Sequence, residues 1–79
     1  MSTRDDVERA VYKHIADVFM RDEVTPDLRF NEDLVAKSSQ YFPLIAALED
    51  ELGVSIDYHS LRNEPTVGDA VNLIAGLNC

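Results

Sequence analysis

Residues 34–56, LVAKSSQYFPLIAALEDELGVSI, contain the pattern that decides the fold. Their second half places Leu44, Ile45, Leu48 and Leu52 on one face of an amphipathic helix. Gly53 follows directly and is a natural left-handed end for that helix. Pro43 would cost about 3 kcal/mol in a helix interior and little within a first turn. The pattern therefore predicts a helix over residues 40–52, with regular geometry beginning near residues 39–42.

Residues 4–20, upstream of this stretch, show the same helical spacing. Their apolar positions are three and four residues apart: Val7, Ala10, Val11, Ile15, Val18 and Phe19. Ser2 or Thr3 can cap the helix, and Asp5 and Asp6 lie in its first turn, where the helix dipole favours negative charge. We expect a first helix over this range.

Residues 21–37 join the two helices and show no sustained period. They contain Pro26 and many charges, but four apolar residues can reach a core: Val24, Leu28, Phe30 and Leu34. Loops of this length are uncommon in compact domains and are often functional. The segment is therefore predicted to be a long ordered loop, and Ser38 lies at its far end.

The remainder of the chain predicts two further helices. Val54 and Ile56 are apolar anchors before a short helix over residues 58–63. Thr66 and Asp69 form a capping-box variant that opens a last helix over residues 67–76. The expected fold is an all-α four-helix bundle that forms one domain over residues 1–79. Its core is expected to contain Val7, Val11, Ile15, Phe30, Leu44, Leu48, Leu52, Ile56, Val71 and Ile74.

Charge and composition restrict the partners of such a domain. Apolar residues make up 46% of the chain, which predicts a folded core, and the formal net charge is -8. This charge repels nucleic acid and anionic lipid and favours partners with basic protein surfaces. The N-terminal segment resembles neither a secretory signal nor a membrane span, so we expect a cytoplasmic protein. The charge and the lack of an apolar stripe beyond the core favour a monomer that binds neither membranes nor nucleic acid. Cys79 is expected to be a frayed terminal residue.

The residue types do not indicate an enzyme. The chain offers Ser38, Ser39, His14, His59 and Cys79, but no Gly-rich elbow and no catalytic or metal-ligand spacing connects them. We expect His14 at the surface of its helix or at the boundary with the core, and His59 on the short helix facing solvent. The acidic run at residues 49–51 forms either a solvated face or a docking face.

Specific positions connect the chain to a known family. Within residues 34–56 they are Leu34, Ala36, Ser38, Leu44, Ala47, Leu48, Glu49, Glu51, Gly53 and Ile56. Outside it they are Val24, Thr25, Pro26, Phe30, Glu32, Asp33 and Thr66, Val67, Gly68, Asp69, Ala70, Val71. With these residues practically the whole chain resembles the acyl carrier protein family.

The resemblance implies a four-helix carrier with a long first loop and a short third helix. It implies that Ser38 receives a 4′-phosphopantetheine arm from coenzyme A, with Lys37 and Ser39 beside the attachment point. The arm would carry an acyl group as a thioester for fatty acid, polyketide or related biosynthesis. The implied partners are a phosphopantetheinyl transferase and acyl-loading and acyl-using enzymes with basic patches. The implied docking residues are Phe42, Ala46, Glu49, Asp50 and Glu51.

The attachment motif departs from the family. Carrier proteins usually have D-S-L, whereas this chain has Lys37, Ser38 and Ser39. Lys37 reverses the charge that helps the transferase engage its substrate. Pro43 replaces a helix residue that is commonly acidic in the family, and Glu64 replaces an apolar residue that usually lines the acyl pocket. Two alternatives therefore stay open: Ser38 could be a plain helix N-cap, and the protein could be an unmodified docking module that acts only through protein–protein contacts.

Overall fold

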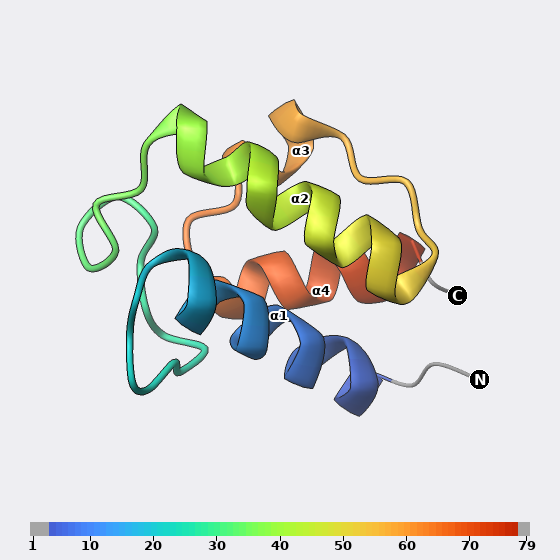
Figure 1. Ribbon diagram of the computed structural model, residues 1–79, viewed down its shortest axis with the longest axis horizontal. Coiled ribbons are helices and arrows are strands. Elements are labelled where there is room, and N and C mark those ends of the chain that lie inside the picture. The colour runs from blue at the N-terminus through green and yellow to red at the C-terminus, as the bar shows by residue number, and fades with distance from the viewer. Residues whose placement is uncertain (1–3, 78–79) are drawn as a thin grey trace.

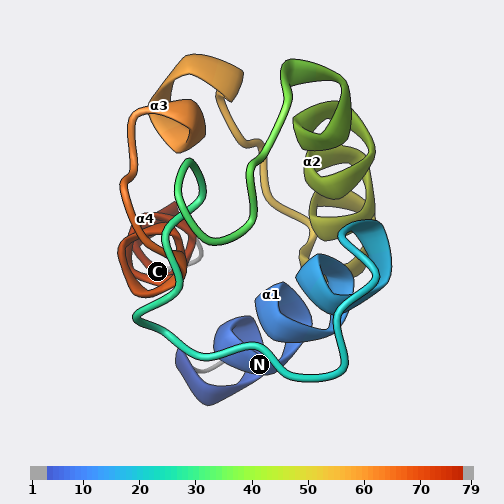
Figure 2. The same ribbon diagram turned by 90° about the vertical axis from the view of Figure 1, so that its left-hand side faces the viewer.

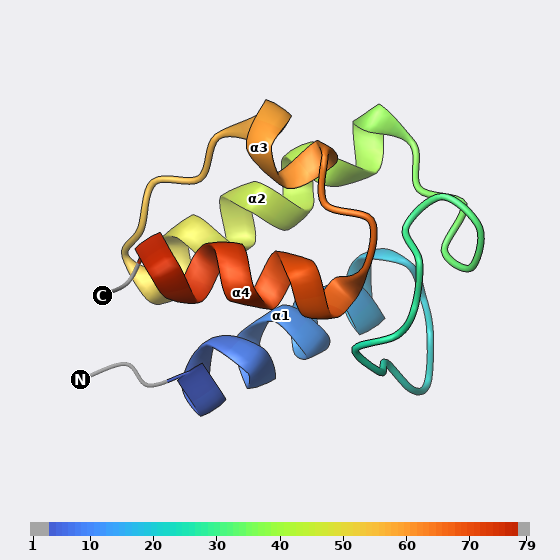
Figure 3. The same ribbon diagram turned by 180° about the vertical axis from the view of Figure 1, so that it is seen from behind.

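The computed structural model describes residues 4–77, which form four helices in the order α1 (Arg4–Val18), α2 (Ser38–Leu52), α3 (Tyr58–Arg62) and α4 (Val67–Leu77). Viewed along the bundle, α1, α2 and α4 surround a common centre, and α3 closes the side between α2 and α4 (Figure 2). From behind, α4 lies directly over α1 (Figure 3). The predicted all-α four-helix architecture is confirmed. The cap predicted at Ser2 or Thr3 and the terminal Cys79 lie outside the described residues.

Helix α1 ends two residues earlier than its apolar spacing predicted. Met20 has a left-handed backbone with φ 54°. The amide of Phe19 donates to the Ile15 carbonyl and the amide of Arg21 donates to the Ala16 carbonyl, both at 2.9 Å. This bonding closes the helix with a Schellman-type turn, although Met20 stands where glycine is usual. The predicted end at residue 20 is therefore wrong, because the left-handed backbone of Met20 cannot continue a right-handed helix.

Helix α2 begins at Ser38, two residues before the predicted start. Lys37 is extended, and its amide donates to Oε1 of Gln40 at 2.8 Å. The Gln40 side chain thus supports a helical turn ahead of Pro43, which becomes the sixth residue of the helix and does not lie in the first turn. Pro43 has no amide hydrogen for the Ser39 carbonyl, so that carbonyl lacks its usual donor. Gly53 ends the helix with φ 66°, as predicted.

The long loop is held against the start of α4 by backbone hydrogen bonds. Phe30 donates to the Pro65 carbonyl at 3.1 Å, and Val67 donates to the Leu28 carbonyl at 2.9 Å. Gly68 donates to the Pro26 carbonyl at 2.8 Å, and a Cβ on Gly68 would lie 3.1 Å from that same oxygen. Figure 1 shows the loop crossing from the end of α1 to the start of α2. The loop that leads to Ser38 is therefore anchored to the start of α4 by backbone hydrogen bonds.

Apolar side chains fill the centre of the bundle. Those buried are Val7, Ala10, Val11, Ile15, Phe30, Leu34, Tyr41, Leu44, Ile45, Leu48, Ile56, Leu61, Val67, Ala70, Val71 and Ile74. The predicted core is confirmed with one correction. Leu52 is only half-buried, because it lies in the last turn of α2 at the edge of the bundle. Tyr41 was not predicted, and its ring is 1% exposed.

Side chains cap both C-terminal helices. Oδ2 of Asp57 accepts from the Ser60 amide at 2.9 Å before α3. Thr66 Oγ1 accepts from the Asp69 amide at 3.2 Å and donates to Asp69 Oδ2 at 2.9 Å, which confirms the predicted cap of α4. Helix α3 ends one residue before the predicted boundary and α4 one residue after it. Across residues 4–77, no helix has the length and apolar character needed to cross a bilayer.

Candidate functional site

Ser38 is the first residue of α2 and is exposed. Lys37, not Ser38, occupies the N-cap position. Within residues 4–77 the Ser38 hydroxyl makes no hydrogen bond, so it does not cap the helix. The structure therefore removes the interpretation of Ser38 as a plain N-cap and leaves its hydroxyl available for chemistry.

The surroundings of Ser38 suit an anionic ester. Amides at the first two positions of a helix have no acceptor within it, so those of Ser38 and Ser39 point out from the N-terminus of α2. The helix dipole favours negative charge at the same place. The first turn of α2 contains no acidic residue, and the exposed ammonium of Lys37 has no ion-pair partner among the described residues. A phosphate attached to Ser38 would therefore meet backbone donors and a cation, with no acidic side chain in the same turn of α2.

An aromatic cluster lies beside the first half of α2. Tyr41 is buried, with its ring centroid 5.5 Å from Phe30 and 6.1 Å from Tyr58. Burial raises the pKa of Tyr41, an effect partly opposed by Arg62, whose guanidinium lies 5.3 Å from the Tyr41 ring. Phe42 faces outward and stacks on Tyr58 at 4.9 Å. The sequence placed Phe42 on a docking face but gave no sign of this stack, because Tyr58 lies on a different helix.

The acidic run at the end of α2 divides into three environments. Glu49 is half-buried, and its Oε2 accepts from the Ile56 amide at 2.7 Å, which holds the segment between α2 and α3. Glu51 contacts α1. Asp50 is exposed and has no partner within the described range. The predicted docking acids are therefore not equivalent, and Asp50 is the one whose carboxylate is uncommitted.

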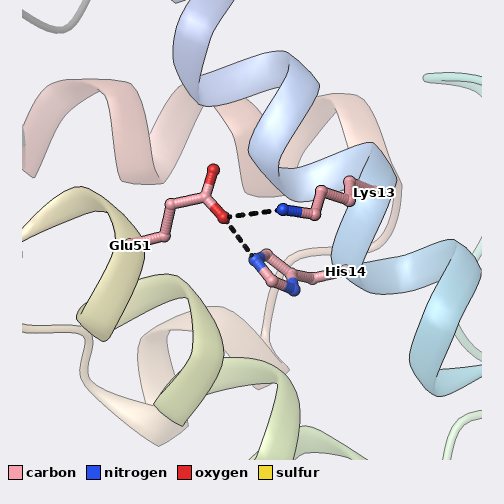
Figure 4. Close-up of polar contacts among 3 residues, drawn as sticks. All are labelled: Lys13, His14 and Glu51. Atoms are coloured by element: carbon pink, nitrogen blue, oxygen red, sulfur yellow. Dashed lines mark hydrogen bonds and ion pairs between the residues drawn. The ribbon is translucent and has the colours of Figure 1, made fainter.

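Glu51 connects α2 to α1 through two basic side chains (Figure 4). Its Oε1 lies 2.8 Å from Nε2 of His14 and 3.3 Å from Nζ of Lys13. The hydrogen bond with His14, followed by that with Lys13, lowers the pKa of Glu51. The His14 side chain lies within α1 and is 16% exposed, as expected of a residue at the helix surface or at the boundary with the core. The negative charge of Glu51 on α2 is thus paired with basic side chains on α1.

The Glu51 contact predicts a pH-dependent contribution to stability. Because folding lowers the pKa of Glu51 from 4.5, its contribution is present above that pH and is lost as pH falls through the lowered pKa. At about pH 7 we expect Glu51→Gln to unfold at a lower urea concentration than the wild type. As pH falls through the lowered pKa, the two urea midpoints should converge. Asp50→Asn is the control, because this carboxylate has no partner in the part of the chain that the structure describes. A gap between the midpoints that does not diminish in acid would contradict the assignment.

The other predicted positions are exposed or half-buried. Ser39 and Ala46 are exposed on α2, and Glu64 is half-buried before α4. His59 is exposed on α3, as expected, with its ring edge-on to Tyr58 at 5.2 Å. No group of three or more His, Cys, Asp or Glu side chains within residues 4–77 is arranged to hold a metal ion.

Comparison with known proteins agrees with the fold. No family model matches the chain. It is 39% identical over 75 residues to the acyl carrier protein of Petrotoga mobilis, covering 92% of this chain and 88% of that protein. It is 36% identical over 76 residues to the acyl carrier proteins of Rickettsia canadensis and Rickettsia conorii, covering 94% of this chain and 88% of each relative. The chain therefore belongs to the acyl carrier protein family, whose members carry acyl groups on 4′-phosphopantetheine and are not themselves enzymes.

Proposed function

We propose that this protein carries its acyl group on a 4′-phosphopantetheine arm attached to Ser38. The observation that supports this most strongly is an exposed hydroxyl at the N-terminus of α2 that makes no hydrogen bond to any of the described residues. When bound, the arm supplies a thiol that holds the acyl group as a thioester. The cargo belongs to fatty acid, polyketide or related biosynthesis.

The chain's own residues present the attachment point and compensate its charge. Ser38 supplies the oxygen that is esterified. The amides of Ser38 and Ser39 and the helix dipole face the resulting phosphodiester, an arrangement worth about 0.3–1 kcal/mol at an exposed site. Lys37 adds a positive charge at the preceding residue. Lys37 thus has two opposed effects, since it stabilises the attached phosphate and replaces the acid that a general transferase expects.

The partners follow from the exposed surface of α2. We infer that the protein is cytoplasmic and monomeric and that it binds a phosphopantetheinyl transferase and acyl-loading and acyl-using enzymes with basic patches. Phe42 and Ala46 contribute exposed apolar contact on this helix, and Asp50 contributes a carboxylate that has no partner among residues 4–77. Glu49 and Glu51 can add long-range attraction while they keep their internal hydrogen bonds. Such charges affect association rate and orientation more than final affinity.

Mass spectrometry of the protein purified from its native host tests the proposal. Trypsin cleavage after Lys37 and Arg62 gives a peptide over residues 38–62 that contains Ser38 and Ser39 together with Ser55 and Ser60. We expect this peptide to carry the phosphopantetheine mass increment and fragmentation to place it on Ser38. An unmodified peptide would contradict the proposal and favour a module that acts only by docking.

Lys37→Asp should raise the rate at which a general transferase loads the protein by at least about tenfold. The substitution restores a negative charge where such an enzyme expects one, and about 1.4 kcal/mol of regained complementarity gives a factor of ten. The gain should shrink with added salt, because exposed charges are screened over about 8–10 Å near physiological ionic strength. The measurement is the initial rate of mass conversion.

Two control variants separate charge from capping in this experiment. Lys37→Ala removes repulsion without adding attraction, so its rate should lie between those of the wild type and Lys37→Asp. Lys37→Asn caps the helix about as well as Asp but is neutral, and it should behave like Lys37→Ala if charge dominates. Equal rates for all four proteins would exclude the charge explanation and direct attention to Ser39 and Pro43.

A further inference from the structure

Phe42 is a large apolar side chain that the core does not use. It is 59% exposed, whereas its neighbour Tyr41 is 1% exposed and supplies the aromatic packing of this part of the bundle. The described residues include three other large hydrophobics with high exposure, Met20, Val35 and Leu77. Phe42 differs from these because its ring is held in a defined orientation.

Tyr58 fixes that orientation. The rings of Phe42 and Tyr58 lie 4.9 Å apart with an interplanar angle of 13°, which is a stacked arrangement. Tyr58 is supported in turn by edge-on contacts with Tyr41 at 6.1 Å and His59 at 5.2 Å. Helix α3 lies beside the first half of α2 (Figure 1), so the contacts of Tyr58 with Tyr41 and Phe42 connect the two helices. Phe42 therefore presents a supported aromatic face to solvent.

This aromatic face lies next to the proposed attachment point. Ser38 and Phe42 are four residues apart in α2, so they lie on the same side of the helix with Cβ atoms about 5–6 Å apart. Long helical side chains lean toward the N-terminus and cover the preceding turn. The Phe42 side chain consequently leans toward the turn that contains Ser38.

We propose that Phe42, backed by Tyr58, is a resting surface for the phosphopantetheine arm. The inference rests on the proposed attachment to Ser38. In 4′-phosphopantetheine the apolar part closest to the phosphate is a carbon with two methyl groups, one methylene away from the ester. That pair of methyl groups is the part of the arm that a ring one helical turn from Ser38 can cover. Phe42 and Tyr58 are then positioning residues that hold the first part of the arm against α2.

The chemical shifts of the two methyl groups test this proposal directly. Protons above an aromatic ring move upfield, so both methyl resonances should be upfield of their positions in free phosphopantetheine. The sample is the full chain loaded with an isotope-labelled arm, and its mass confirms loading before the spectrum is recorded. We also expect nuclear Overhauser contacts between these methyl groups and the Phe42 ring.

Variants distinguish the resting surface from general apolar contact. Phe42→Leu should remove the upfield shift while the arm remains attached. Tyr58→Leu keeps the Phe42 ring but removes its support, so the shift should shrink without disappearing. Leu77→Ala is the control, since Leu77 is an exposed apolar residue in the last turn of α4 and should leave both resonances unchanged.

The outcomes separate this inference from the proposed function. A loaded protein whose methyl resonances match those of the free arm would overturn the resting surface and leave the attachment to Ser38 standing; Phe42 would then be a contact for partner enzymes. A wild-type shift that persists in Phe42→Leu would also overturn it. A chain that carries no arm when purified from its native host would overturn both proposals.

Discussion

Ser38→Ala is expected to abolish loading by a competent phosphopantetheinyl transferase. The substitution removes the only atom that can form the ester at this position, so the loss should be complete and not a reduction in rate. The wild-type hydroxyl is exposed and makes no hydrogen bond within residues 4–77. Removing it should therefore change the free energy of unfolding by less than about 0.5 kcal/mol. Mass spectrometry after incubation with coenzyme A and transferase measures the result.

Ser39→Ala is the matched control for this experiment. Ser39 is the second residue of α2, is also exposed, and differs from Ser38 by a step of one along the helix. Its variant should still load at a measurable rate. Loading that survives in Ser38→Ala and disappears in Ser39→Ala would move the attachment point to Ser39. Loss of loading in both variants with an unchanged urea midpoint would indicate that the transferase requires both hydroxyls.

Apolar spacing predicted the four helices because it reports directly which face of each helix is buried. It could not locate their ends, which depend on single backbone conformations. Met20 adopts a left-handed conformation in spite of its Cβ, and no local signal marks it, whereas Gly53 does mark the end of α2. The start of α2 depended on a hydrogen bond from the Lys37 amide to the Gln40 side chain, which overrode the expected effect of Pro43.

The candidate site was predictable where it follows the chain and unpredictable where it crosses between helices. Ser38 was identified through its family position, which lies at the end of an anchored loop. The pairing of Glu51 with His14 joins residues 37 apart in sequence, and the stack of Phe42 on Tyr58 joins α2 to α3. Helical periodicity says which side chains share a face but not which face of another helix they meet. Periodicity therefore could not show that Glu49 and Glu51 make hydrogen bonds within residues 4–77 while Asp50 makes none.

The centre of the core offers the largest expected change in stability. Leu48 lies in the middle of the buried face of α2 and is 0% exposed. Leu48→Ala should lower the free energy of unfolding by about 2–5 kcal/mol, since the side chain is lost and the cavity it leaves is only partly filled. A domain of this size has a net stability of only about 3–5 kcal/mol, so a large fraction of this variant should be unfolded at room temperature.

Two further variants keep this prediction measurable even if Leu48→Ala does not fold. Leu48→Met conserves volume and should cost less than about 1.5 kcal/mol. Leu52→Ala removes the same atoms from the half-buried last turn of α2, where less surface is withdrawn from water, so its cost should fall well below that of Leu48→Ala. Urea denaturation followed by circular dichroism gives all three values. A Leu48→Ala cost below about 0.5 kcal/mol, the range of ordinary surface substitutions, would show that α2 does not bury this face.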